Sequence, residues 1–322
     1  MPLRDARKIR NFFLVSLAVL VVFMFAARPV SRTEERRIFV IQTGERFTDI
    51  ANRLEQVRLV RSAALFKTLA LLTLRAGNLQ AGTYELSSNF STVRILDYLS
   101  SGSGRSVTVR VLEGISVYEV DMLLAERGVI TRGDLVRIVL ERSLEGQLFP
   151  DTYEFFLNSD VEEVLDKFLA NFDGKVAPLL AKEENSAKII TVLASLLERE
   201  VPDYEERRIV AGILKKRYTA SMPLQVDATV CYVKRLKNLI EWTDSCYPLD
   251  PLDFKLNSPY NTYVHSGYPP GPIGNPGLSA FLASLDPEPS PYWFYLSDPV
   301  TKRTIFSKTL EEQQTNKLRY LR

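Results

Sequence analysis

Apolar residues recur along this chain with two spacings, and these spacings predict its secondary structure. Phe47, Ile50, Ala51 and Leu54 follow the three- and four-residue spacing of one helix face. Short apolar or alternating runs of roughly four to eight residues are instead typical of strands. Strands are expected at 38–41, 83–86, 107–112 and 292–296. Helices are expected at 47–54, 63–74, 93–99, 117–124, 131–140, 161–172, 187–200 and 204–218, and from 308 onward.

These elements predict an α+β fold in two folded units. A small α/β unit is expected over 38–103, because the serine and glycine cluster at 100–104 interrupts the apolar pattern. A larger, mixed α+β unit is expected over 104–322. Its C-terminal part should be rich in loops, since seven prolines between Pro269 and Pro291 break up any long element.

The most apolar stretch lies near the N-terminus and predicts a single membrane-spanning helix over 11–28. Between Arg10 and Arg28 the chain carries no charge, which is typical of a membrane anchor. The alternative is a signal peptide, but cleavage after Ala26 or Ala27 would place a bulky residue where a small one is expected. We therefore expect a cytoplasmic tail at 1–10, the helix, and a linker at 29–37. Basic residues flank the helix equally, so they do not fix its orientation.

Composition narrows the classes of function. The chain has 322 residues, of which 46% are hydrophobic and 25% charged, and this suffices for a sizeable core. Lys and Arg number 41 against 39 Asp and Glu, so no basic excess argues for a nucleic-acid partner. One histidine and two cysteines disfavour a zinc site of His and Cys ligands. Cys231 and Cys246 could form a disulfide in an oxidising compartment or remain free thiols.

The helix expected at 187–200 carries a candidate catalytic carboxyl group. At about 100° per residue, one apolar stripe is formed by Ile189, Ile190, Leu193, Leu196 and Leu197. Glu200 falls within this stripe, whereas Glu198 points the opposite way. Burial raises the pKa of a carboxyl group and keeps it protonated near neutral pH, as a general acid requires. Alternatively, Glu200 simply leaves the core where the helix ends, before Val201 and Pro202.

A second candidate segment is 224–230, in which apolar and polar residues alternate. As a strand it would place Gln225, Asp227 and Thr229 on one face, where they could line a polar cleft. The alternative is that this face is exposed on an edge strand.

The third candidate is the loop 258–277, which combines tyrosines, prolines, glycines and asparagines. Tyr260 offers an aromatic face and Asn261 an amide, and sugars are often held by such groups. A long loop without regular structure is usually functional or disordered, and the proline and aromatic content disfavours disorder. His265, inside this loop, is expected to be a surface residue.

Several strings occur together and in order. They are Leu-Glu-Gly at 112–114, Leu-Phe-Pro-Asp-Thr-Tyr at 148–153, Ala-Ser-Leu-Leu-Glu-Arg-Glu at 194–200, Leu-Gln-Val-Asp-Ala-Thr-Val at 224–230, and Tyr-Asn-Thr-Tyr with Gly-Tyr-Pro-Pro-Gly-Pro-Ile-Gly-Asn-Pro-Gly between 260 and 277. With them the sequence, from Ile38 to its C-terminus, resembles the MltG family of endolytic murein transglycosylases, also called YceG-like proteins.

This resemblance implies a bacterial inner-membrane protein whose larger part lies in the periplasm or extracytoplasmic space. It implies a LysM-like first unit and a catalytic second unit that cleaves peptidoglycan strands internally. The bond is that from N-acetylmuramic acid to N-acetylglucosamine, and the product has a 1,6-anhydro end. The family's catalytic glutamate corresponds to Glu200. No cofactor or metal is implied, and peptidoglycan synthases are implied as partners besides the glycan itself.

The same resemblance suggests weaker candidates for substrate contact, namely Gln225, Asp227, Tyr260 and Asn261. Some positions depart from the family's pattern: Ala228 stands where a proline is usual, and Gln147 where an aromatic residue is usual. Thr304 and Gln313 stand where histidines are usual, so no role is assigned to them. Two other functions remain open, a muramidase-type hydrolase and a non-catalytic glycan-binding scaffold.

Overall fold

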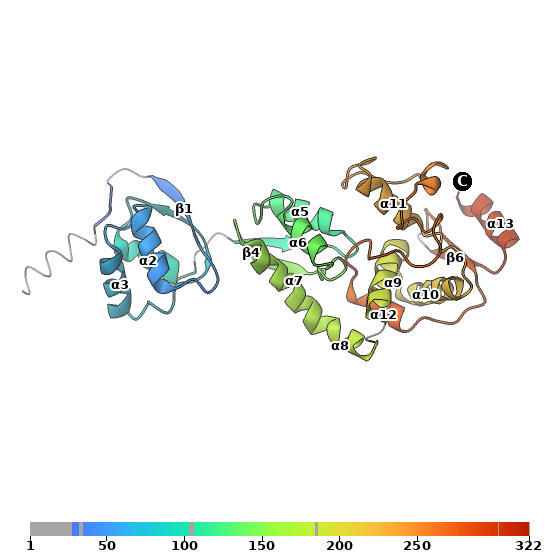
Figure 1. The fold of residues 1–322 in the computed structure, drawn as a ribbon, viewed down its shortest axis with the longest axis horizontal. Helices are drawn as coiled ribbons and strands as arrows, with labels where there is room; N and C mark the ends of the chain where they lie inside the picture. Colours follow the sequence, from blue (N-terminus) through green and yellow to red (C-terminus); the bar gives the residue numbers. More distant parts are fainter. Residues whose placement is uncertain (1–27, 32–34, 103–105, 184–185, 302, 322) are drawn as a thin grey trace, which may run out of the picture. The chain divides into compact units, whose positions relative to one another are not determined.

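The computed structural model describes residues 28–31, 35–102, 106–183, 186–301 and 303–321. The expected tail at 1–10 and, apart from Arg28, the expected membrane-spanning helix lie outside the described residues. Within the described ranges, no helix is both long and apolar enough to span a bilayer. The fold is mixed α+β, as predicted, with twelve α-helices and three two-stranded sheets in these ranges (Figure 1).

The chain forms two compact units, and neither is one continuous segment. The first takes residues up to 108 together with 127–129 and 154–163. The second takes 109–126, 130–153 and 164–322. Hydrogen bonds hold the two later segments in the first unit. The Thr43 N–H donates to Glu163 Oε1 at 2.7 Å, and the Asn158 N–H donates to Gly128 O at 2.9 Å.

The first unit begins with a strand, two helices and a second strand. Its elements are β1 (Arg36–Ile41), α2 (Phe47–Gln56), α3 (Ala63–Leu72), β2 (Gly82–Ser87) and α4 (Thr92–Ser100). β1 and β2 are antiparallel, with Phe39 opposite Tyr84, and both side chains are buried. The helices cover the sheet with apolar residues at helical spacing, such as Ile50 and Leu54 of α2. This order of elements agrees with the predicted strands and helices, and the LysM-like character stays a prediction.

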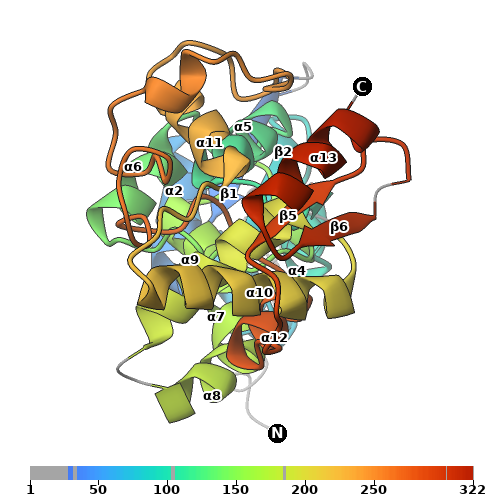
Figure 2. The same cartoon turned by 90° about the vertical axis from the view of Figure 1, so that its right-hand side faces the viewer.

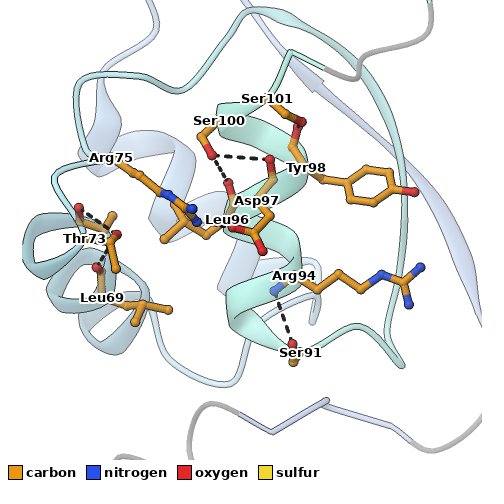
Figure 3. Close-up of polar contacts among 11 residues, drawn as sticks. Leu69, Thr73, Arg75, Ser91, Arg94, Leu96, Asp97, Tyr98, Ser100 and Ser101 are labelled. Atoms are coloured by element: carbon orange, nitrogen blue, oxygen red, sulfur yellow. Dashed lines mark hydrogen bonds and ion pairs between the residues drawn. The ribbon is translucent and has the colours of Figure 1, made fainter.

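Polar contacts fix the ends of the helices in this unit (Figure 3). The Ser91 hydroxyl accepts the Arg94 N–H at 3.2 Å and caps the first turn of α4. Arg75, just after α3, forms an ion pair with Asp97 of α4. In the last turn of α4, the Ser100 hydroxyl donates to Leu96 O at 2.7 Å. Local capping thus defines where these short helices begin and end.

The second unit is mainly helical. A small two-stranded sheet is formed by β3 (Ser106–Arg110) and β4 (Thr152–Phe156), and each strand has residues in both units. The remaining elements are α5 (Val117–Glu126), α6 (Asp134–Glu141), α7 (Val161–Lys175), α8 (Ala177–Leu180), α9 (Ala187–Glu200), α10 (Tyr204–Thr219), α11 (Asp227–Leu236), α12 (Leu278–Leu285), β5 (Phe294–Ser297), β6 (Thr304–Ser307) and α13 (Leu310–Tyr320), with 3-10 turns at Ala181–Glu183 and Asp253–Lys255.

Helix α9 lies at the centre of this unit and is packed against α10, α11 and α12 (Figures 1 and 2). Every residue from Ile190 to Leu197 is buried, because neighbours surround the helix on several sides. Ile189, predicted to belong to the buried stripe, is instead 41% exposed at the N-terminal end of the helix. The core of the unit therefore lies around the C-terminal half of α9, next to Glu200.

One expectation for the C-terminal half was wrong. The segment 224–230 does not form a strand: Gln225 has a positive φ of 54°, and α11 begins at Asp227. The alternation of apolar and polar residues continues through Val230, but the acidic Asp227 suits the first turn of a helix. The proline-rich region was expected to be rich in loops, and it also holds the short helix α12 between Pro276 and Pro287. The stretch 237–277 does lack helices and strands other than one 3-10 turn.

Candidate active site

Glu200 is the last residue of α9, and the local sequence explains why the helix ends there. Pro202 disfavours helical backbone at the residue before it. Val201 is accordingly extended, with φ −139° and ψ 122°, and its side chain is buried. The chain turns at once into α10, where the Asp203 side chain accepts the Glu206 N–H at 3.0 Å. Glu200 is thereby held at a fixed corner between two helices.

The Glu200 carboxyl group faces the start of α11. The Ala228 N–H, in the first turn of that helix, donates to Glu200 Oε1 at 3.3 Å. Asp227, the residue before Ala228, is close enough that its negative charge acts on Glu200. Two carboxyl groups from α9 and α11 therefore lie together at the junction of these helices.

The surroundings of Glu200 favour its protonated form. Burial is the largest cause and raises the pKa of Glu200 to about 7, and the charge of Asp227 acts in the same direction. The Ala228 N–H and the Tyr295 hydroxyl oppose this rise in pKa. A carboxyl group with a pKa near 7 can donate a proton at neutral pH and take it back afterwards.

Three tyrosines surround this pair of carboxyl groups. The Tyr263 hydroxyl donates a short hydrogen bond to Asp227 Oδ1. The Tyr295 hydroxyl is buried and near Glu200, yet it forms no hydrogen bond of normal geometry with a described residue. Tyr247 is exposed and feels the charges of both carboxyl groups. The loss of solvent around the hydroxyl groups and these charges raise the pKa of all three phenols, so they remain neutral hydrogen-bond donors.

A disulfide brings Tyr247 to this site. Cys231 of α11 is bonded to Cys246, with their Cα atoms 5.7 Å apart. The structure therefore selects the disulfide over the free thiols that the sequence left open. Because Cys246 precedes Tyr247, the cross-link holds that tyrosine close to the first turns of α11.

A buried ion pair between α9 and α10 stabilises the C-terminal end of α9. Glu198 Oε1 accepts from Arg207 Nη2 of α10 at 2.5 Å, and both side chains are only 5% exposed. Glu198 Oε2 accepts the Gly277 N–H at 2.9 Å. Arg207 Nε also donates to Val201 O, the residue after Glu200. Glu198, which the helical spacing placed opposite the apolar stripe, is therefore buried as well, and its contacts fix the corner on which Glu200 sits.

The structure separates the residues that the sequence grouped as substrate contacts. Asp227 lies beside Glu200, and Gln225 is an exposed residue two positions before it. Asn261 has no exposed surface: its amide donates to Phe254 O and Leu256 O, and its carbonyl accepts the Tyr263 N–H. Through these contacts Asn261 stabilises the conformation of the loop. Its role as a substrate contact stays an untested prediction.

Tyr260 belongs to a second group, centred on another buried acid that the sequence did not single out. Glu145 is 9% exposed and accepts the Val117 N–H at 3.0 Å and the Asn275 side-chain amide at 3.0 Å. Burial raises the pKa of Glu145 to about 8, against the effect of the Val117 N–H. Tyr118, Tyr232 and Tyr260 lie around this carboxyl group.

The tyrosines of both groups were only partly visible in the sequence. Tyr263 belongs to the Tyr-Asn-Thr-Tyr string, and Tyr295 lies in a predicted strand, but neither pattern connects them to Glu200. Gln313, to which no role was assigned, is buried and donates through Nε2 to Tyr295 O at 2.9 Å, so it anchors β5. Among the described residues, no group of three or more His, Cys, Asp or Glu side chains could hold a metal ion.

Two similar proteins of known name are both endolytic murein transglycosylases. The chain is 26% identical to an endolytic murein transglycosylase of Bacillus subtilis, over 91% of this chain and 87% of that protein. It is 24% identical to an endolytic murein transglycosylase of Streptococcus pneumoniae over 89% of this chain, and it spans only 59% of that longer protein.

A solved structure is also similar. The crystal structure of a yceG-like protein from Listeria monocytogenes has a TM-score of 0.54 and 26% identity, and the match covers 88% of this chain and 100% of that one. The sequence model of the YceG-like family matches residues 39–319, which includes both units and Glu200. The chain therefore belongs to the YceG-like family.

Proposed function

We propose that this protein is an endolytic peptidoglycan lytic transglycosylase with Glu200 as its catalytic acid and base. The observation that carries the proposal is the carboxyl group at the end of α9, whose pKa burial raises to about 7. The names of the relatives from Bacillus subtilis and Streptococcus pneumoniae support the same class of reaction. The proposed bond is that from N-acetylmuramic acid to N-acetylglucosamine, within a glycan strand.

The proposed reaction needs one carboxyl group in two protonation states. Glu200 first donates its proton to the glycosidic oxygen while positive charge develops at the sugar ring. It then takes the proton from the C6 hydroxyl of the same sugar as that oxygen attacks, which closes the 1,6-anhydro ring. Asp227, oriented by Tyr263, keeps Glu200 protonated at the start and offers negative charge near the developing cation.

Replacement of Glu200 tests the proposal. Glu200→Gln should abolish release of anhydro-muropeptides from purified peptidoglycan, measured by mass spectrometry, because the amide cannot exchange a proton with the substrate. Glu205→Gln, on the exposed surface of α10, is the matched control and should keep the parent activity. Retained cleavage by Glu200→Gln would reject this residue as the catalyst.

A muramidase-type hydrolase is the second candidate, and Asp227 is the observation in its favour. Hydrolysis normally uses a second carboxylate as base or nucleophile, and Asp227 is the group beside Glu200. The products decide between the two reactions. A transglycosylase leaves anhydro ends, whereas a hydrolase leaves reducing ends that are heavier by one water. A glycan-binding scaffold would bind peptidoglycan and release no fragments at all.

The proposed location follows from the N-terminal sequence. We infer a single-pass anchor at 11–28 in the cytoplasmic membrane, with both folded units on the extracytoplasmic side, where peptidoglycan is found. The disulfide between Cys231 and Cys246 supports an oxidising compartment. Protease added to intact spheroplasts should digest the folded units if this orientation is correct, and it should leave them intact if they face the cytoplasm.

A further inference from the structure

A pocket lies in the second unit, around the first half of α9. Its volume is about 560 Å³, within the range of small-ligand sites in proteins. Residues from the end of α6, from α7 and α8, from the start of α9 and from the loop at 270–272 form its walls. Glu145 and Tyr260 line it, so the second group of polar residues described above faces this pocket.

The walls of the pocket combine apolar surface with polar groups that are not used elsewhere. Leu140, Phe172 and Pro272 supply apolar surface. The side chains of Gln147 and Lys188 form no hydrogen bond or ion pair with a described residue. Glu145 adds a carboxyl group that is protonated near neutral pH, and its recorded contacts all donate to it. A protonated carboxyl carries one hydrogen to donate.

Tyr260 contributes an aromatic ring and a hydroxyl group to the pocket. Its ring packs against Tyr232, with centroids 5.1 Å apart, and its hydroxyl forms no hydrogen bond within the described part of the chain. Gly271 lies opposite this hydroxyl and leaves it accessible, because a Cβ at Gly271 would be 3.1 Å from Tyr260 Oη. Such a close approach would crowd the one phenol that faces the pocket.

The loop 258–277 connects the pocket to the pair of carboxyl groups. On α9 itself, Thr191 in the pocket wall precedes Glu200 by nine residues, which is about 13 Å along the helix axis and about half a turn around it, so the two residues lie on opposite faces of the helix. Tyr260 lines the pocket and precedes Tyr263, the partner of Asp227, by three residues, so their Cα atoms are at most roughly 11 Å apart. An oligosaccharide that reaches both places would therefore run along this loop and not along α9.

We propose that this pocket is a remote glycan subsite, which binds an N-acetylated hexosamine of the strand that is cut at Glu200. The inference rests on the proposed function and adds where the substrate is held. The amide of Gln147, the Tyr260 hydroxyl and the Glu145 carboxyl match the hydroxyl and amide groups of such a sugar. The apolar wall accommodates its acetyl methyl group, and the Tyr260 ring offers a stacking face.

Chemical footprinting tests occupancy directly. The full-length Glu200→Gln protein is incubated with a β-1,4-linked hexamer of N-acetylglucosamine, and lysine acylation is followed by mass spectrometry. Lys188, exposed in the pocket wall, should be acylated more slowly as the hexamer saturates the protein. Lys215, exposed on α10, should react at an unchanged rate. Binding without protection of Lys188, or no binding by either the hexamer or peptide-free murein glycan, would overturn the proposal.

Substitutions in the pocket supply the second measurement. Tyr260→Phe and Gln147→Ala each remove a group that bonds to nothing described, so the fold should tolerate both. Each should weaken hexamer binding by about 3- to 10-fold in titration calorimetry, the value of one hydrogen bond. Tyr218→Phe, an exposed tyrosine of α10, is the matched control with parent affinity. Parent affinity in both pocket variants would refute the subsite.

These experiments keep the two proposals apart. Binding and footprinting use a protein that cannot cleave, so they report on binding and not on catalysis, and the protection of Lys188 assigns the binding to the pocket. Cleavage of peptidoglycan by the parent protein reports on the proposed function. If the parent releases anhydro fragments while Lys188 stays unprotected, the subsite fails and the function stands. If Lys188 is protected and the parent releases no fragments, the function fails and the pocket remains a sugar-binding site.

Discussion

At the scale of single residues, the charge of Asp227 should add to the effect of burial and extend the pH range over which Glu200 holds its proton. Its negative charge raises the pKa of Glu200, so Asp227→Asn should lower that pKa. In the parent, kcat/KM should fall as pH rises through about 7, because the acid form of Glu200 is lost. In Asp227→Asn this fall should occur at lower pH. The measurement is the pH profile of kcat/KM on peptidoglycan.

Tyr263→Phe is the control for this prediction. It removes the hydrogen bond to Asp227 but leaves the charge of Asp227 in place. The fall in kcat/KM should therefore stay near the parent's pH in this variant, whatever happens to the maximal rate. An identical pH profile in Asp227→Asn and the parent would contradict the electrostatic argument.

Residue types and spacing identified Glu200 because a single helix with a regular apolar face displays it. Asp227 was found from an alternation of apolar and polar residues, although that segment does not form the strand that the alternation predicted. Glu145 was missed because its burial depends on Val117 and Asn275, which are 28 and 130 residues away in sequence. No local pattern contains that information.

At the scale of elements, the buried ion pair of Glu198 and Arg207 should determine the stability of the α9–α10 corner. Arg207→Met would leave Glu198 buried without its charged partner. Removal of one member of a buried pair costs about 3–5 kcal/mol. The free energy of unfolding from urea denaturation should fall by that amount, and catalytic activity should fall because Glu200 loses its fixed position.

The double variant Glu198→Gln with Arg207→Met provides the comparison. It removes both charges, so no ion is left buried alone, and its loss of stability should be smaller than that of Arg207→Met. Equal losses in the two variants would show that Arg207 acts through its hydrogen bond to Val201 O and not through the charge of Glu198.

The helices and strands differed in how well their bounds could be predicted from the sequence. Helix α9 was predicted with its observed bounds, because Pro202 sets its end and its apolar residues recur regularly. Helix α11 was not, since every residue from Ala228 to Arg235 is buried and no polar face reveals the helical period. Its charged residues are buried with partners: Lys234 Nζ binds Asp253 Oδ2 at 2.7 Å. Such tertiary partners are invisible in a local pattern.

At the scale of the whole molecule, Glu145 should make stability depend on pH. Burial raises its pKa in the folded protein to about 8, above the ordinary value of 4.5. The folded state therefore binds a proton that the unfolded chain has lost, so stability falls as pH rises from about 4.5 through 8. Glu145→Gln should flatten this dependence, because an amide oxygen can accept the same hydrogen bonds without ionising.

The measurement is the melting temperature of the parent and of Glu145→Gln between pH 5 and about pH 8. Glu200 acts in the same direction, so the variant should keep a smaller decline and not lose it entirely. A decline as steep as the parent's would show that Glu145 is already ionised in the folded protein.

The discontinuous first unit limits how this protein can be rearranged by evolution or by an engineer. Residues 127–129 and 154–163 belong to that unit although they lie beyond the start of the second one. A single recombination point after residue 108 would separate these two stretches from the strand Gly82–Ser87, in which the Thr83 hydroxyl donates to Leu157 O. Exchange of the first unit for another module would require the replacement of three separate segments of the chain. We expect natural relatives to vary by additions at the ends of the chain more readily than by replacement of this unit.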